Sequence, residues 1–479
     1  MSKENYSSIN SVLWSIIGRY LPSLVQIIST IVIARLITPQ DFGEVALITV
    51  FIQISSLLIT SGFAEALIFR VKNSNVLYSS VFYFNISIAL FLYCILYLLS
   101  NNIANFYDIS RLEILSKVVG LNMIINSFTY IQRVFFMLEG NFKTPAIIIL
   151  ISSLFGSITG VSLAFNGYGV WALVYQTLLI NLIQLILFWK ISNWKPEFVF
   201  SIKELKIIIP YSFKILSNNI IQVFYDNVYT LVIGKMFSSK TLGYYNRMQT
   251  LVYFTTTNFM YAIETVFYPI LCRSKDNTTK IKDSYELLLR TSTFIAFPIL
   301  VILISLGEPI IIILLSKKWI GSLQILQLIS IAYLFIPVIY INNSFLKILN
   351  RPDVLLKTGF LKKGIGILIL IITANYSIET VMYGIIIYSF IDFIISVLVT
   401  QSLMMISVKK QLGFIFNNFI LNILLLLFLN YISSYFDNIY LKVFVSVVIG
   451  GVFYLVIPIL LKLKEFKIFK SIFKRKRKI

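Results

Sequence analysis

The sequence predicts an all-α polytopic membrane protein with about 14 transmembrane helices, arranged as two pseudo-symmetric six-helix lobes around a central cavity plus a C-terminal helix pair. Hydrophobic residues make up 58% of the 479 residues and charged residues only 13%, too apolar for a soluble globular protein. Almost the whole chain consists of charge-poor apolar segments of about 20 residues, long enough for a helix to cross a bilayer. The sequence lacks the alternating pattern of membrane-spanning strands.

Each predicted span is an apolar run between short polar or basic connections. The predicted spans are residues 11–37, 42–64, 78–100, 114–138, 145–166, 170–190, 207–236, 243–268, 288–315, 323–346, 354–374, 380–402, 412–432 and 439–461. We therefore predict an N-terminal lobe over 1–200 and a C-terminal lobe over 201–403. Residues 404–479 are predicted to hold two accessory transmembrane helices and a basic cytoplasmic tail.

A repeated segment predicts the two-lobe arrangement. Ile33–Gly43 reads IARLITPQDFG, and Ile233–Gly243 reads IGKMFSSKTLG. In both copies an apolar helix with a basic residue near its end meets a polar turn, and a glycine precedes the next apolar run. Each copy closes the first helix of a six-helix set, which indicates an internal duplication. Those first helices also carry Pro22 and Pro210 in their first halves, where proline favours a bend.

The basic residues predict the orientation in the membrane. Lysine and arginine total 41 against 20 acids, for a net charge of +21. With the N-terminus inside, about 27 of them fall in or near cytoplasmic segments and about 8 outside. We therefore expect a multi-pass protein of the bacterial cytoplasmic (inner) membrane with both termini in the cytoplasm. The basic run Lys474–Lys478 is expected to lie near anionic lipid headgroups rather than to bind nucleic acid.

Several functional classes are not supported by any motif. The chain has no histidine, which excludes histidine-based triads and imidazole metal sites. Its two cysteines, Cys94 and Cys272, imply no disulfide framework. There is no phosphate-binding loop or dinucleotide motif, and we predict neither an enzyme, nor a metal, nor a cofactor. The GxxxG of Gly156 and Gly160 predicts close helix packing.

Charged residues inside the predicted spans are the candidate functional residues, because an ionisable group at membrane depth costs on the order of 2.5–3.5 kcal/mol and usually faces a wet cavity or a partner. The candidate cavity cations are Arg19, Lys214, Arg247 and Lys362, and the candidate coupling or charge-balancing acids are Asp226, Glu264 and Asp392. A basic pocket would favour an anionic ligand such as a pyrophosphate-linked lipid. The acids either balance that charge or exchange a proton, and the sequence leaves both roles open.

Three further charges lie nearer the ends of their spans. The side chains of Arg133, Glu264 and Lys363 are within reach of the membrane interface, and we expect that position more than a cavity position.

The chain resembles the polysaccharide flippases of the multidrug/oligosaccharidyl-lipid/polysaccharide exporter superfamily. The segments that carry the resemblance occur in matching order: ARLITPQDFG (Ala34–Gly43), GYGVWALVYQ (Gly167–Gln176), DNVYTLVIGK (Asp226–Lys235), LGYY (Leu242–Tyr245), YPIL (Tyr268–Leu271) and LNRP (Leu349–Pro352). The resemblance implies transport of undecaprenyl-pyrophosphate-linked O-antigen, capsule or exopolysaccharide repeat units by alternating access. It implies a generally cationic cavity, no nucleotide hydrolysis, and possible contacts with a polymerase and other glycan-assembly proteins.

Two alternatives remain. A multidrug or cation antiporter of the same superfamily would require an acid-dominated cavity, whereas the embedded cations here outnumber the acids. A membrane polysaccharide polymerase or ligase would present a large outer loop, but the longest one predicted is about Asn101–Glu113. The sequence does not identify the glycan, the coupling ion or the oligomeric state.

Overall fold

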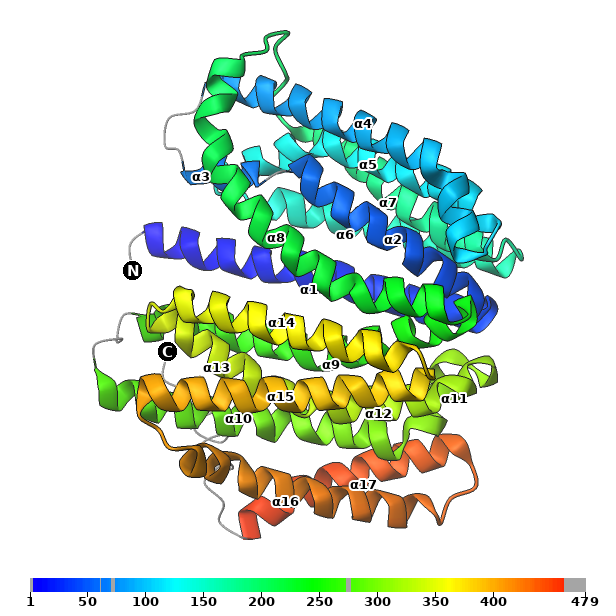
Figure 1. Ribbon diagram of the computed structural model, residues 1–479, viewed down its shortest axis with the longest axis vertical. Helices are drawn as coiled ribbons and strands as arrows, with labels where there is room; N and C mark the ends of the chain where they lie inside the picture. Colours follow the sequence, from blue (N-terminus) through cyan, green and yellow to red (C-terminus); the bar gives the residue numbers. More distant parts are fainter. Residues whose placement is uncertain (1–2, 61, 70–73, 273–276, 461–479) are drawn as a thin grey trace. The chain divides into compact units, whose positions relative to one another are not determined.

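The computed structural model describes the backbone of residues 3–60, 62–69, 74–272 and 277–460, and all the secondary structure in these ranges is helical (Figure 1). Within them, 12 helical stretches are long and apolar enough to cross a membrane. The two other predicted spans, 243–268 and 354–374, coincide with helices α9 (Ser239–Cys272) and α14 (Pro352–Ala374), which carry more polar and charged residues. The predicted class, an all-α polytopic membrane protein, is confirmed, and the predicted count of 14 spans is approximate. The predicted basic run Lys474–Lys478 lies outside the described residues.

The chain divides into two compact units, Met1–Gly243 (unit 1) and Tyr244–Ile479 (unit 2). Unit 1 contains the first turn of α9 and the helices α1 (Lys3–Leu36), α2 (Pro39–Thr60), α3 (Phe63–Phe69), α4 (Asn75–Tyr107), α5 (Arg111–Leu138), α6 (Lys143–Phe165), α7 (Val170–Ile191) and α8 (Ile202–Met236). Unit 2 contains the rest of α9, then α10 (Thr278–Ser305), α11 (Gly307–Leu315), the 3-10 helix η1 (Lys317–Ser322), α12 (Leu323–Tyr333), α13 (Ile336–Ile348), α14, α15 (Ile378–Met404), α16 (Val408–Ser433) and α17 (Ile439–Leu460).

Unit 1 is held together by close packing of neighbouring helices. Helices α4 and α5 pack along their lengths, α7 packs against α5 and α6, and α1 packs against α6 (Figure 1). A Cβ atom added at Gly156 would lie 2.3 Å from Ile180 Cγ1, and one at Gly160 would lie 2.8 Å from Gln176 Cβ. Only glycine lets α6 and α7 approach this closely, and the close packing predicted from the GxxxG motif is confirmed.

Unit 2 is organised around α10, which packs against α12, α13 and α16. The sequence predicts single spans over 288–315 and 323–346, but the structure breaks both. The first ends at Ser305 and continues as α11, and the second is interrupted between Tyr333 and Ile336. Pro309 lies near the start of α11 and Pro337 in the first turn of α13. A proline removes a backbone donor, so it is tolerated in the first turn of a helix and favours a break just before it.

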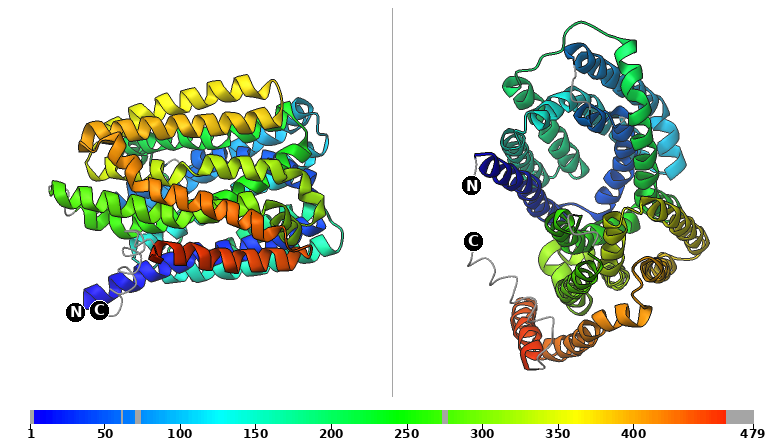
Figure 2. Two further views of the ribbon diagram at one scale, coloured as in Figure 1. Left: turned by 90° about the horizontal axis from the view of Figure 1, so that it is seen from below. Right: turned by 90° about the vertical axis from the view of Figure 1, so that its left-hand side faces the viewer.

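The C-terminal pair α16 and α17 packs against α10 through buried polar side chains. Asn418 Nδ2 donates to Arg290 O at 3.0 Å and to Thr293 Oγ1 at 2.8 Å. Tyr454 Oη of α17 donates to Phe294 O at 2.8 Å. Figure 2 shows α16 and α17 as an orange-to-red hairpin. The two predicted accessory helices are therefore present and have specific contacts within unit 2.

The repeated segment has the same backbone structure in both copies. Helix α1 ends at Leu36 and α2 begins at Pro39; helix α8 ends at Met236 and α9 begins at Ser239. At the turns, Ile37 N donates to Ile33 O at 3.0 Å and Phe237 N donates to Ile233 O at 3.0 Å. Corresponding residues thus occupy corresponding positions, as an internal duplication requires.

The two copies also meet at their glycines. A Cβ added at Gly43 would lie 1.9 Å from Ser239 O, and one added at Gly243 would lie 1.8 Å from Pro39 O. The contact is reciprocal in the numbering of the repeat, as expected for a pseudo-two-fold relation. The predicted limits of the three parts, 1–200, 201–403 and 404–479, remain predictions; α8 itself packs against α2, α3 and α4 of unit 1.

Candidate functional site

The candidate site is a polar cavity inside unit 1, which we call the Arg133 cavity. Its volume is about 420 Å³, and it lies among α1, α2, α5 and α7. The lining consists of one cation, four carboxamides, five hydroxyl-bearing residues and two isoleucines: Gln26, Ser56, Ile59, Thr60, Asn126, Thr129, Tyr130, Arg133, Thr177, Ile180, Asn181 and Gln184. A polar cavity inside a bundle of apolar helices is a site for a polar ligand or for water.

Helix geometry explains why these side chains face one space. On α5, Asn126, Thr129, Tyr130 and Arg133 follow at spacings of three and four residues, so they share one face of the helix. Arg133 is exposed although its helix neighbours Gln132 and Val134 are buried. The guanidinium is therefore accessible from the cavity side of a tightly packed helix.

The opposite faces of α5 and α7 line a second cavity. It has a volume of about 530 Å³ and only apolar side chains and one tyrosine: Leu121, Ile124, Ile125, Leu163, Tyr175, Leu178, Leu179 and Leu182. Leu163 comes from α6; by the helical period the other residues lie away from the polar set on α5 and α7. Helices α5 and α7 thus separate a polar space from an apolar one, as expected for a lipid-facing surface next to a hydrated interior.

Some polar groups of the Arg133 cavity are already engaged. Asn181 Nδ2 donates to Asn122 Oδ1 at 2.6 Å, and Thr177 Oγ1 donates to Val174 O at 2.9 Å. Ala64 N donates to Tyr130 Oη at 2.8 Å. Within the described part of the chain, no hydrogen bond is formed by the side chains of Ser56, Asn126 and Gln184, a set that remains available to a ligand or to water.

Arg133 itself has no hydrogen-bond or ion-pair partner among the residues that the structure describes. The lining of the cavity, as described, includes no aspartate or glutamate. A guanidinium is always protonated, and it binds carboxylate and phosphate oxygens in a two-pronged geometry. The cavity can therefore attract an anionic group, and it offers no carboxylate to a cation.

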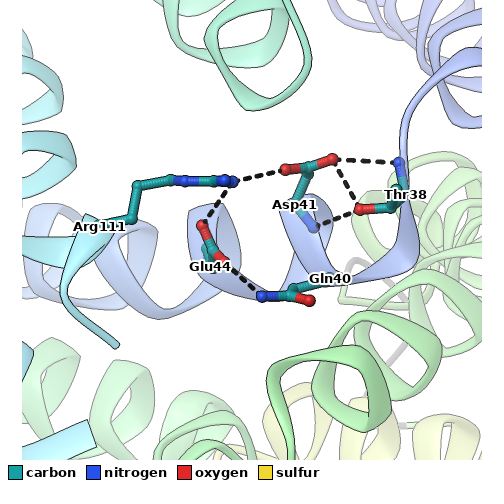
Figure 3. Close-up of polar contacts among 5 residues, drawn as sticks. All are labelled: Thr38, Gln40, Asp41, Glu44 and Arg111. Atoms are coloured by element: carbon teal, nitrogen blue, oxygen red, sulfur yellow. Dashed lines mark hydrogen bonds and ion pairs between the residues drawn. The ribbon is translucent and has the colours of Figure 1, made fainter. Parts of the chain in front are cut away.

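An ion-pair cluster fixes the end of unit 1 where α2 and α5 begin. Arg111 Nη1 lies 2.9 Å from Asp41 Oδ1 and 3.3 Å from Glu44 Oε2 (Figure 3). Thr38 N and Oγ1 donate to Asp41 Oδ2 at 3.1 and 2.7 Å, and Gln40 donates to Glu44 at 3.1 Å. Glu44 is 1% exposed and Arg111 is 50% exposed. Asp41 of the repeated segment and the next residue after that segment, Glu44, thus hold the α1–α2 turn to α5.

The structure places two of the predicted charges of unit 1. Arg19 is exposed on α1, seven residues before the cavity-lining Gln26 and hence on the same face of that helix. Asp226 is exposed on α8 and accepts from Gln222 Nε2 at 2.9 and 3.1 Å. Lys214 also lies on α8, but its side chain is outside the described residues. Cavity binding by these residues remains a prediction.

In unit 2 the structure brings two predicted residues into direct contact. Lys362 Nζ lies 2.6 Å from Asp392 Oδ1, and it donates to Ser396 Oγ at 2.8 Å. The lysine is 7% exposed and the aspartate 16% exposed. Asp392 therefore has a cationic partner, and its coupling or charge-balancing role stays a prediction. The substrate-binding role proposed for Lys362 is not tested by this contact.

The remaining predicted acid and cation of unit 2 lie on α9. Glu264 Oε1 accepts from Lys347 Nζ at 3.0 Å, and its Oε2 accepts from Tyr340 Oη. Both donors lie on α13, so these two contacts join α9 to α13. The ammonium group of Lys347 also balances the charge of the Glu264 carboxylate. Arg247 is half-buried in the first half of α9.

Sequence reasoning did not select Arg133 as a cavity residue, because its position near a span end favoured the membrane interface. The available signal was the spacing of polar residues at intervals of three, one and three positions, which puts them on one helix face: Asn126, Thr129, Tyr130 and Arg133. It marks a polar face on α5, but only the packing of α1, α2 and α7 shows that this face lines a cavity.

Residues 32–324 match a family model described as "Polysaccharide biosynthesis protein". The succinoglycan biosynthesis transport protein ExoT of Rhizobium meliloti (strain 1021) is 21% identical over 67% of this chain and 65% of its own length. The teichuronic acid biosynthesis protein TuaB of Bacillus subtilis (strain 168) is 21% identical over 71% of each chain. The lipopolysaccharide biosynthesis protein WzxC of Escherichia coli (strain K12) is 23% identical over 74% of this chain and 73% of that protein.

Two solved structures have a similar fold. The lipid II flippase MurJ in an inward closed conformation matches with a TM-score of 0.74 and 18% identity, over 98% of this chain and all of that chain. An inward-facing multidrug resistance MATE family transporter of the MOP superfamily matches with a TM-score of 0.59 and 14% identity, over 83% of this chain and 99% of that chain. These similarities show that the chain shares the helical fold of these two proteins.

Proposed function

Because the chain belongs to the polysaccharide biosynthesis protein family, we propose that it is a flippase for lipid-linked oligosaccharides. It would move undecaprenyl-pyrophosphate-linked repeat units from the inner to the outer leaflet of the bacterial inner membrane, with its termini in the cytoplasm. The relatives named for succinoglycan, teichuronic acid and lipopolysaccharide biosynthesis support a glycan substrate.

The observation that carries the proposal is the Arg133 cavity. A flippase must offer a polar path for a sugar head group through an apolar bilayer, and it must attract an anionic ligand. Unit 1 provides a polar cavity with one cation and, within its described lining, no acid. Helices α5 and α7 set this cavity apart from an apolar one, which supports a mechanism that keeps the lipid tail in the bilayer.

The mechanism we infer is alternating access by two lobes. The repeat unit enters from the inner leaflet, and the candidate cations Arg19, Lys214, Arg247 and Lys362 hold the pyrophosphate oxygens. The lobes then rock so that the site opens outward. Asp226, Glu264 and Asp392 balance charge or couple an ion to the movement. The ion pairs of Glu264 and Asp392 support the charge-balancing role for those two.

The main alternative is a multidrug or cation antiporter, which the MATE-like fold allows. A cationic drug needs carboxylates at its binding site. The polar cavity of unit 1 has a guanidinium instead, and this favours an anionic substrate. A polymerase or ligase is less well supported, because the described connections between helices are short.

The test is the sidedness of the lipid-linked oligosaccharide after depletion of the protein. Intact spheroplasts are treated with a membrane-impermeant probe of the sugar, in a strain without a second flippase. The expected result is accumulation on the cytoplasmic leaflet that re-expression reverses. Normal sidedness would refute the flippase function, and drug resistance on overexpression without a glycan defect would favour the antiporter.

Charge reversals then test the candidate cations. Arg19→Glu and Lys214→Glu should stop transport without loss of folded protein in the membrane. Lys190→Glu, at the exposed end of α7, is the matched control and should transport normally. Full transport by both the Arg19 and Lys214 variants would remove these two residues from the mechanism.

A further inference from the structure

We propose that the Arg133 cavity is a sugar subsite that binds a sugar residue bearing a carboxylate, with Arg133 contacting the carboxylate and the neutral side chains contacting the hydroxyls. The inference rests on the proposed function and names the class of glycan that this site would select. In this proposal the Arg133 cavity binds the sugar, and the pyrophosphate is bound by the candidate cations named above: Arg19, Lys214, Arg247 and Lys362.

The first argument is charge. Arg133 has no ion-pair or hydrogen-bond partner among the described residues, and the described lining has no acid. The described lining offers this cation no counter-charge, and the attraction between it and a bound anion is stronger in a partly desolvated cavity than in bulk water. A bound carboxylate would supply the missing negative charge and match the two-pronged geometry of the guanidinium.

The second argument is the number of charges. A pyrophosphate group carries more than one negative charge, and its binding requires several cations close together. The Arg133 cavity has a single cation among nine neutral polar residues and two isoleucines. One guanidinium balances one carboxylate, so a singly charged sugar fits this cavity better than a pyrophosphate does.

The third argument is the chemistry of the neutral groups. A sugar hydroxyl both donates and accepts hydrogen bonds, and so does a carboxamide. Asn126 and Gln184 line the cavity, and neither side chain has a hydrogen-bond partner within the described ranges. Thr129 and Thr177 donate to their own helix backbones, which leaves lone pairs on their oxygens that accept from a ligand.

The fourth argument is size and access. A volume of about 420 Å³ lies within the range of roughly 300–1,000 Å³ found for small-ligand sites. This space takes a small part of a glycan rather than a whole repeat unit. Arg133 is exposed, so a ligand can reach the guanidinium without any opening of the packed core.

The test is ligand binding to the full-length protein in detergent, measured by saturation-transfer NMR, which detects weak complexes. The probes are glucuronate, glucose and inorganic phosphate. The variants are Arg133→Gln, Arg133→Lys and the control Lys190→Gln, each checked for folding by thermal unfolding. We expect glucuronate to bind the wild-type protein and Lys190→Gln equally. Arg133→Gln should bind glucuronate roughly tenfold more weakly than the wild-type protein does. The affinity of Arg133→Lys should lie between those of the wild-type protein and Arg133→Gln.

Each other outcome overturns the proposal. Glucose binding as tightly as glucuronate would show that the cavity does not distinguish the charge. Phosphate binding that displaces glucuronate would indicate a site for free small anions. Binding that survives Arg133→Gln, or no binding of any probe to the wild-type protein, would exclude Arg133 as the contact.

The leaflet assay separates this inference from the proposed function. If the wild-type protein does not move the lipid-linked glycan, the flippase function fails whatever the binding experiment shows. If it does, and Arg133→Gln moves the glycan as fast as the wild-type protein, the sugar subsite fails while the flippase function stands.

Discussion

Replacing Gly43 by alanine should destabilise unit 1, because the glycine contact between the two copies of the repeat leaves no room for a side chain. The new Cβ would lie 1.9 Å from the backbone oxygen of Ser239 and 2.9 Å from its carbonyl carbon. Both obstacles are backbone atoms, so no side-chain rotation relieves the clash. The two helix ends would have to separate by about 1 Å in a close-packed interior.

Two effects of opposite sign determine the magnitude. Overpacking of a tight contact costs about 1–3 kcal/mol, and a backbone obstacle places this case at the upper end. Alanine in a helix gains up to about 1 kcal/mol over glycine. The net loss is therefore about 2 kcal/mol. For a unit of this size that loss corresponds to a fall in the unfolding temperature of roughly 4–8 °C.

The assay is thermal unfolding of the detergent-solubilised full-length protein. Gly364→Ala is the matched control, because nothing lies within 4 Å of a Cβ at that helical glycine. It should be neutral or slightly stabilising. Gly243→Ala should behave like Gly43→Ala, since its Cβ would lie 1.8 Å from Pro39 O. The double variant should lose less stability than the sum of the losses of the two single variants, because both substitutions separate the same surfaces. If Gly43→Ala unfolds at the same temperature as Gly364→Ala, the reasoning is wrong.

Three further substitutions test individual contacts by the same unfolding assay. Arg111→Gln should lower the free energy of unfolding by about 1–2 kcal/mol, mainly because it leaves the buried carboxylate of Glu44 without its ion-pair partner. Adding Glu44→Gln should recover part of this loss. A double variant no more stable than Arg111→Gln would contradict this explanation. Lys362→Met should lower the free energy of unfolding by about 3 kcal/mol, because it leaves Asp392 without its ion-pair partner at 2.6 Å. The double variant Lys362→Met/Asp392→Leu should be more stable than Lys362→Met alone. Asn418→Leu removes two hydrogen bonds to α10 and should lower the free energy of unfolding by about 2 kcal/mol. It should also speed proteolysis between α15 and α16, and Asn417→Leu is the neighbouring control. Equal cleavage of both variants would count against the predicted anchoring role of Asn418.

The sequence was sufficient to predict the membrane class and most helices, because span length and apolar composition are local properties. It also predicted the internal repeat, whose two copies end and restart their helices at equivalent residues. The turn chemistry is likewise local: Thr38 and Asp41 cap one copy, and Ser238 caps the other through Thr241 N.

The breaks in unit 2 were not predicted, although the responsible prolines were visible. Pro298 stays inside α10, whereas Pro309 and Pro337 lie in first turns. A neighbouring helix, a serine or threonine side chain or a water molecule can satisfy the backbone carbonyl that a mid-helix proline leaves without a donor. The residue type alone therefore does not decide between a bend and a break. The decision depends on how α10, α12 and α13 pack around each other.

The sequence alone determined which residues are charged inside the spans, and the tertiary structure decided what each of them faces. Lys362 and Asp392 lie on neighbouring helices and meet in an ion pair. Arg133, which the sequence placed at the interface, lines a polar cavity built from four helices. The reason is physical: the helical period fixes the face of a side chain, but the environment of that face is created by segments far away in the chain.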